Sequence, residues 1–297
     1  MARFRTALEQ GVTHAHELGG RAQAAIWLDG WPGPIEVGDD LDHPMRMWSM
    51  AKPVEAIAVL QRAARDGVRP TAGFRLAMQR ALRRSENCAA RRMVLELEQL
   101  SGGPHGARVA FAAVLRDAGA HPVVASETDA PADQSAECEA FLVRERSGLA
   151  EPDSEAVLFG TSRWTVADAV RFAHALGNGR YGAAGPSVLV TMAKPKRLSQ
   201  ERGAVFTADP LWGAGLAFHG YPVAYKAGWG GAQQGAFLAG QFAIVDLDGR
   251  RAAVAAMFHP GTQPRIDDPG ETPAPQALQE TFAAVARAFP RLRATHR

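Results

Sequence analysis

The stretch "MWSMAKPVEA", residues 47 to 56, places Ser49 three positions before Lys52 at the start of an apolar run with helical spacing. Residues three apart share one face of a helix, so their side chains can meet. Lysine is rare here, because only four of the 33 basic residues are lysine. Arginine keeps its proton, whereas a lysine in a desolvated, cationic pocket can act as a base. Ser49 and Lys52 are therefore a candidate nucleophile and base; the alternative is an exposed serine cap beside a solvated lysine.

The bulk composition is that of an ordinary soluble globular protein. The chain has 297 residues, of which 46% are hydrophobic and 22% charged, enough for one large domain or two smaller ones. The formal charge is only +2 and the basic residues are spread along the chain, which argues against a nucleic-acid partner. No window approaches the roughly 20 apolar residues of a membrane span. No signal peptide is recognisable either, so we predict a cytoplasmic protein without a membrane partner.

The sequence offers no pattern for a metal site, a cofactor or a Ser-His-Asp triad. Cys88 and Cys138 lie about fifty residues apart, which fits no metal motif, and we expect buried free thiols in preference to a disulfide. No Gly-x-Ser-x-Gly motif occurs. The nine histidines are scattered without metal-ligand spacing, among them His14, His16, His105, His174, His219 and His259.

Hydrophobic periodicity predicts an α/β fold of the α+β kind. We assign residues 1–44 and 215–297 to one discontinuous mixed lobe and residues 45–214 to a mainly helical lobe, with the site in the cleft between them. Residues 121–160 are expected to form a long loop region. Helices are predicted over 3–18, 49–64, 71–82, 88–100, 105–120, 165–176 and 276–289, and strands over 21–29, 34–40, 221–229, 235–249 and 250–258.

Two further segments contain residues of the kinds that act together with a serine and a lysine such as Ser49 and Lys52. "RRSENCAARR" places Ser85 and Asn87 between two predicted helices, and "AYKAGWGGAQQG" places Lys226 near the end of a predicted strand. Together with Ser49 and Lys52 they resemble the Ser-x-x-Lys, Ser-x-Asn and Lys-Thr-Gly motifs of the serine β-lactamase and penicillin-binding protein superfamily, with divergent class A-like motifs. The resemblance covers nearly the whole chain. It implies an antiparallel sheet flanked by helices plus an all-helical lobe, as in β-lactamases and transpeptidases.

The resemblance also implies a role for each matching residue. Ser49 would be the acylated nucleophile, and Lys52 would take its proton. Ser85 would relay a proton to the leaving group, and Asn87 would hold the amide carbonyl of the substrate. Lys226 would supply a positive field that lowers the amine pKa of Lys52 and favours an anionic substrate.

Later positions add an oxyanion hole and a candidate for water activation. By the same resemblance, the backbone N–H groups of Ser49 and Trp229 would hold the oxyanion, and Gly228 would lie beside the substrate. The stretch "LAEPDSEAV" is similar to the Glu-Pro-x-x-Asn loop of class A enzymes. It makes Glu151 the candidate that activates the deacylating water, and it places Glu155 at the asparagine position.

Three departures from the superfamily pattern bear on the substrate. Glu86 stands where many members have aspartate, and Ala227 lacks the hydroxyl that helps to bind a β-lactam carboxylate. The Trp229-Gly-Gly run resembles the third motif of esterases in the superfamily. We therefore expect a serine hydrolase acting on a small-molecule or peptide-like amide, ester or β-lactam through an acyl-serine. Slow deacylation would make it a penicillin-binding protein, and the alternative is a non-catalytic ligand-binding or scaffold protein.

Overall fold

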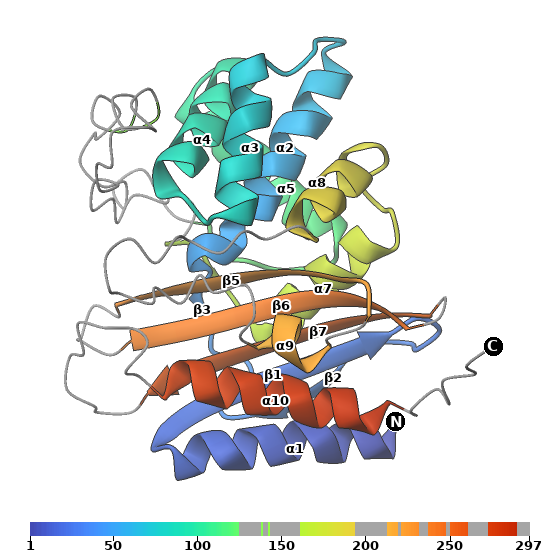
Figure 1. Ribbon diagram of the computed structural model, residues 1–297. Coiled ribbons are helices and arrows are strands. Elements are labelled where there is room, and N and C mark those ends of the chain that lie inside the picture. Colours follow the sequence, from blue (N-terminus) through green and yellow to red (C-terminus); the bar gives the residue numbers. More distant parts are fainter. Residues whose placement is uncertain are drawn as a thin grey trace.

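A five-stranded antiparallel sheet forms the centre of the protein (Figure 1), with the strand order β2-β1-β7-β6-β5. The structure is a computed structural model, and it describes residues 1–124, 138, 142, 161–193, 213–218, 221–231, 237–247, 250–260 and 273–289. The strands of the sheet are β1 (Gly20–Leu28), β2 (Ile35–Gly38), β5 (Val223–Gly231), β6 (Phe237–Leu247) and β7 (Arg250–Pro260).

Both faces of the sheet are buried, which explains why its strands are apolar at nearly every position. In β1, Ala24 and Ile26 face one hydrophobic core, whereas Ala25 between them belongs to the core on the opposite face. Successive side chains of a strand point to opposite faces, so covering both faces requires continuous apolar runs. On the first face lie the two terminal helices, α1 (Ala2–Glu17) and α10 (Ala274–Ala288), which pack against each other and against the sheet (Figure 1).

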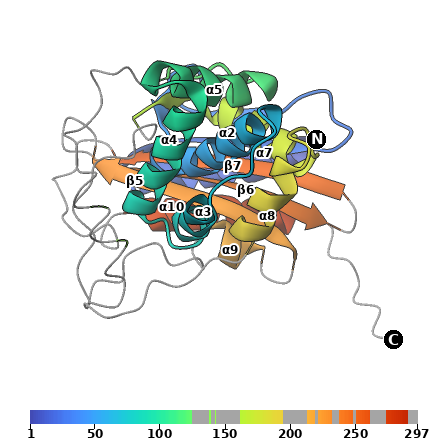
Figure 2. The same cartoon turned by 90° about the horizontal axis from the view of Figure 1, so that it is seen from above.

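The opposite face carries most of the other helices, whereas the short helix α9 (Ala214–Ala217) packs on α10 and belongs to the first face. Seen from above, the helical group α2 to α5 lies over the sheet together with α8 (Figure 2), and these helices pack on one another. A short 3₁₀ helix, η1 (Trp48–Ala51), precedes α2 and contacts β5, so it lies where the helical group meets the sheet. The further elements are α2 (Lys52–Arg65), α3 (Ala72–Arg83), α4 (Asn87–Ser101), α5 (Pro104–Asp117), α7 (Val166–Gly177), α8 (Ala184–Met192), α9 (Ala214–Ala217) and the strand pair β3 (Met45–Arg46) and β4 (Arg163–Trp164).

Helix α7 packs directly on strands β1, β6 and β7. It begins with a capping box, in which the Asp168 backbone N–H donates to Thr165 Oγ1 at 3.2 Å and the Thr165 backbone N–H donates to Asp168 Oδ2 at 3.1 Å. Helix α7 falls within residues 45–214, which we predicted as the helical lobe, yet it packs on strands of the predicted mixed lobe. The predicted division of the chain into two lobes stays a prediction.

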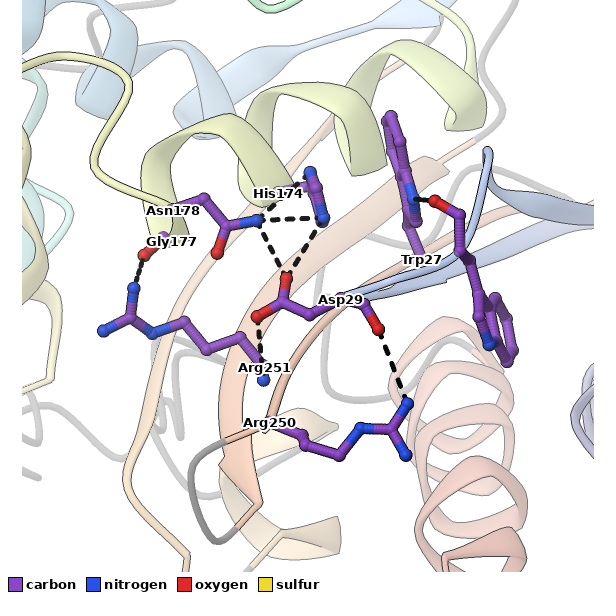
Figure 3. Close-up of polar contacts among 8 residues, drawn as sticks. Trp27, Asp29, His174, Gly177, Asn178, Arg250 and Arg251 are labelled. Carbon is purple, nitrogen blue, oxygen red and sulfur yellow. Dashed lines mark hydrogen bonds and ion pairs between the residues drawn. The ribbon is translucent and has the colours of Figure 1, made fainter.

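The last turn of α7 is fixed to the sheet by a polar cluster around Asp29 (Figure 3). Asp29 Oδ1 accepts a hydrogen bond from Asn178 Nδ2 at 2.8 Å and lies 3.2 Å from His174 Nε2. The His174 ring stacks on Trp27, with ring centroids 4.1 Å apart. Burial lowers the pKa of His174, and the Asp29 carboxylate opposes that shift. These contacts give His174 a structural role in joining β1 to α7.

The predicted α+β fold class is confirmed, and the predicted helices and strands correspond to the observed elements. Sequence reasoning missed the β3–β4 pair and the helices α8 and α9. Of the predicted loop region 121–160, only 121–124, 138 and 142 are among the described residues. In the described part of the chain, no helix is both long and apolar enough to cross a membrane.

The expectation of two free thiols is wrong. Cys88, at the start of α4, forms a disulfide with Cys138 across a sequence separation of 50 residues. Their Cα atoms are 4.8 Å apart, which is within the usual range for a disulfide. Spacing along the chain could not reveal this pair, because two residues this far apart are brought together only by the packing of the whole fold.

We expect reduction of this disulfide to destabilise the protein by about 4 kcal/mol, because opening a loop of this length restores chain entropy to the unfolded state. Urea unfolding followed with and without dithiothreitol measures the difference. A Cys88→Ala/Cys138→Ala double variant is the control, and its unfolding midpoint should not respond to the reductant. Two thiols that can be alkylated in the denatured, unreduced protein would contradict the pairing.

Candidate active site

Ser49 lies in η1, at the junction of the helical group and the sheet. The preceding residue, Trp48, has a φ of 46°, a left-handed conformation that is uncommon for a bulky residue. Strand β5 approaches this turn closely. A Cβ atom added at Gly228 would lie 2.7 Å from the Met47 carbonyl oxygen and 2.9 Å from the Ser49 backbone nitrogen. Only glycine therefore fits at position 228, and it brings the backbone of β5 against the backbone of the candidate nucleophile.

Lys52 is the first residue of α2, and its side chain is fully buried. Its amine donates to Asn87 Oδ1 at 2.8 Å, to Ser85 Oγ at 3.3 Å and to the Ser85 carbonyl oxygen. Three acceptors suit the three N–H bonds of an ammonium group. Between the described residues, no hydrogen bond joins the Lys52 amine to the Ser49 hydroxyl. To take the proton of Ser49, the amine must become uncharged and turn its lone pair toward that hydroxyl.

Lys226 enters the same site from β5 and is only 4% exposed. Its amine donates to Ser85 Oγ at 2.8 Å and to the Ala227 carbonyl oxygen at 2.9 Å. The Ser85 hydroxyl thus lies between two buried lysine amines. Burial and, next, the charge of Lys52 lower the pKa of Lys226 well below its ordinary value, and Glu55 partly opposes that shift. The geometry therefore brings together Lys52, Ser85, Asn87 and Lys226.

The turn that carries Ser85 and Asn87 is held by a buried ion pair. Ser85 has a φ of 60°, in the left-handed region, and Glu86 after it is the N-cap residue of α4. The Glu86 carboxylate accepts a hydrogen bond from Arg80 Nε, and the second carboxylate oxygen lies 3.4 Å from Arg84 Nη1. Arg80 and Glu86 are both buried. Many members of the superfamily have aspartate at this position. Here the longer Glu86 side chain is paired with Arg80 and Arg84, and these contacts fix the backbone of the Ser-x-Asn turn.

Replacing Arg80 with alanine should destabilise the protein by about 3 to 5 kcal/mol, because the buried Glu86 carboxylate loses its closest cationic partner. Chemical unfolding at neutral pH measures the effect. Arg62→Ala is the matched control, since Arg62 pairs with Asp66 near the surface of α2, and it should cost less than about 1 kcal/mol. Equal losses in the two variants would show that the buried pair does not hold the turn.

Other predicted site residues are placed only partly or lie outside the described residues. The backbone of Trp229 is part of β5, opposite Ala239 of β6. Glu151 and Glu155 lie outside the described residues, and so do Lys194 and Lys196, which sequence reasoning treats as surface charges. In the described ranges, no group of His, Cys, Asp and Glu side chains could hold a metal ion.

One residue of the site was missed by sequence reasoning. Glu55 follows Lys52 by three positions on α2 and is fully buried. Among the residues that the structure describes, neither of its carboxylate oxygens has a hydrogen-bond partner. Burial raises the pKa of Glu55 to about 8, and the charges of Lys52 and Lys226 limit the rise. The signal was an acidic residue within the apolar run of α2, at a spacing that puts it on the face of Lys52.

Comparison with solved structures identifies the architecture. The sequence matches no protein-family model and no curated protein. The structure, however, is similar to the TLA-1 extended-spectrum β-lactamase, with a TM-score of 0.62 at 14% identity, covering 95% of this chain and 99% of that one. The chain has the serine β-lactamase fold. A β-lactamase from Xanthomonas campestris pv. campestris (TM-score 0.61, 18% identity, 96% and 98% covered) and a class A β-lactamase from Mycobacterium abscessus (TM-score 0.59, 18% identity, 95% and 99% covered) share it.

Within this β-lactamase fold, the predicted superfamily resemblance is confirmed at the level of architecture. The identities of 13% to 18% among the similar β-lactamase structures carry the fold and not the reaction. The chemistry must therefore be argued from the residues that this chain places around Ser49.

Proposed function

We propose that the protein is a serine hydrolase that acts on an amide, ester or β-lactam through an acyl-serine intermediate. The observation that carries the proposal is the Ser85 hydroxyl, which accepts hydrogen bonds from the amines of both Lys52 and Lys226 at 3.3 and 2.8 Å. Two buried lysines beside one hydroxyl cost stability, because each disfavours the charged form of the other. Such an arrangement suggests a purpose other than stability. Proton transfer next to a nucleophile is such a purpose.

The proposed reaction begins with an uncharged Lys52 amine taking the proton of Ser49 Oγ as that oxygen attacks the acyl carbon. The carbonyl oxygen becomes an oxyanion, held by the backbone N–H groups of Ser49 and Trp229. Collapse of the tetrahedral intermediate breaks the bond to the leaving group. The Lys52 proton then reaches the leaving group through Ser85, whose hydroxyl lies within hydrogen-bond distance of the Lys52 amine. Water hydrolyses the acyl-serine, and the proposal leaves open whether Glu151 activates that water.

The substrate is proposed to be a small-molecule or peptide-like acyl compound. In its protonated form, Lys226 supplies positive charge beside the site, which favours an anionic group on the substrate. Ala227 supplies no hydroxyl for a β-lactam carboxylate, so we include esters and simple amides with β-lactams as possible classes of substrate.

We propose no nucleic-acid or membrane partner. The predicted cytoplasmic location stays a prediction, and the Cys88–Cys138 disulfide weighs against it, because disulfides persist mainly in oxidising compartments.

A fluorescent penicillin, nitrocefin and short-chain nitrophenyl esters, assayed side by side, test the proposal. Intact-mass spectrometry should find one acyl adduct, located on Ser49 by peptide mapping. The Ser49→Ala variant should give no adduct and no hydrolysis above background. Absence of any adduct in the wild type across this panel would overturn the proposed acyl-serine chemistry.

A second candidate function is ligand binding without catalysis. It is favoured by the Lys52 amine, which donates to Ser85 and Asn87 and, among the described residues, not to Ser49. The Ser49→Ala variant separates the two candidates. Ligand affinity unchanged by the substitution, together with no turnover in the wild type, would support the binding protein. A trapped acyl group would exclude it.

A further inference from the structure

The site contains a buried acid that the proposed reaction does not use. Glu55 is one turn of α2 beyond Lys52, and both side chains are 0% exposed. No ion pair or hydrogen bond joins Glu55 to either lysine within the described residues, so it acts on them through space. A buried carboxyl without a hydrogen-bond partner is unfavourable for stability. Packing alone does not explain an acid at this position, since an apolar side chain of similar size would fill the space at lower cost.

The charges that act on Glu55 are those of the two site lysines. Lys52 lies on its own helix and Lys226 on β5, and both lower the pKa of the carboxyl against the effect of burial. Helices α3, α4, α5 and α8 also pack on α2. Among the described residues, the charges that shift the pKa of Glu55 are those of Lys52 and Lys226. Charged groups on α3 and α4 also pair with each other: Arg80 with Glu86, and Arg91 with Glu98.

We propose that Glu55 is a positioning residue of the site, whose buried carboxyl controls through space whether Lys52 carries a proton. The inference rests on the proposed function, in which the uncharged amine of Lys52 is the base. An ionised Glu55 stabilises the ammonium form of Lys52 and so opposes the reaction. A protonated Glu55 exerts no such attraction, and the amine then loses its proton at lower pH. The acid thus sets the pH at which acylation of Ser49 begins.

The test is the pH dependence of Ser49 acylation in Glu55→Gln and Glu55→Met variants, read by the rate of adduct formation. The wild-type carboxyl is ionised only above its pKa of about 8. Both substitutions remove that negative charge, so the part of the acid limb above about pH 8 should move to lower pH by about one unit or more. Glu55→Asp should restore part of the wild-type profile. The control, Asp66→Asn, removes a carboxylate from the C-terminal end of the same helix and should leave the profile unchanged.

A second readout does not depend on activity. The carboxyl of Glu55 is titrated by ¹³C NMR in the wild type and in Lys52→Met, with the Glu55→Gln spectrum identifying its signal. Coupling is reciprocal, so loss of the Lys52 charge should raise the pKa of Glu55. An identical titration in the two proteins would overturn the inference, whether or not the protein acylates. A second result would also overturn it: wild-type Ser49 forms an adduct, and the acid limb of the pH profile of adduct formation is the same in the wild type and in both Glu55 variants. That result would leave the proposed hydrolase intact. If no adduct forms at all, the proposed function fails and the NMR titration alone decides the coupling.

Discussion

Replacing Lys52 with methionine is expected to slow acylation of Ser49 by about 10²- to 10⁴-fold, which is the usual contribution of a positioned general base. Methionine keeps most of the volume of the buried stem and removes the amine, so the loss reports on chemistry more than on packing. The measurement is the rate of adduct formation under single-turnover conditions, followed by intact-mass spectrometry.

The matched control for this prediction is a surface cation on the same helix. Arg65→Met removes a charge near the C-terminal end of α2 and should leave the acylation rate within about twofold of the wild type. Circular dichroism and an unfolding curve establish that Lys52→Met is folded. A folded Lys52→Met protein that acylates at the wild-type rate would show that another group takes the proton of Ser49.

The second large effect is expected from Gly228→Ala. The added Cβ would lie 2.7 Å from the Met47 carbonyl oxygen and 2.9 Å from the Ser49 nitrogen, so β5 and η1 must move apart. That movement displaces the Ser49 N–H from the position in which we propose it holds the oxyanion. Loss of one such donor typically lowers the rate by about 10²- to 10³-fold. The overpacking should also cost about 1 to 3 kcal/mol of stability.

Gly33→Ala provides the control, because a Cβ added at Gly33 meets no atom within 4 Å. Its acylation rate should equal that of the wild type, and its stability should change by less than about 1 kcal/mol. Michaelis parameters for a nitrophenyl ester, with unfolding curves, measure both variants. If Gly228→Ala loses stability but keeps its rate, the close approach of β5 serves packing and not the oxyanion.

Much of the fold was predictable, because its signals are local. The apolar spacing of residues 3–18 predicts the helix observed as α1, and the run before Asp29 predicts β1. Thr165 and Asp168 predict the capping box of α7 from two side chains three positions apart. Helix α8 was missed, because Ala184–Met192 is short and its apolar residues do not mark one clear face.

The part of the candidate site that lies within one short stretch of the chain was predictable. The part that depends on contacts between distant segments was predictable only in part. Ser49 and Lys52 are recognisable together because η1 and α2 are continuous in the chain. The burial of Glu55 was not evident from the sequence. Whether this face of the helix is buried or solvated depends on what the tertiary structure packs over it. The disulfide of Cys88 was mispredicted for a related reason, since its partner comes from a distant segment.

The sequence by itself determined most of the secondary-structure elements, the three lysine and serine motifs and the α+β class, because all of these depend on residue spacing over short stretches of the chain. Only the tertiary structure decided that Lys226 and Ser85, 141 residues apart, share a hydrogen bond, and that Glu86 is paired with Arg80 in the interior. The physical reason is that periodicity specifies which face of an element is apolar, whereas the protonation and pairing of a side chain depend on what the packed fold places against it.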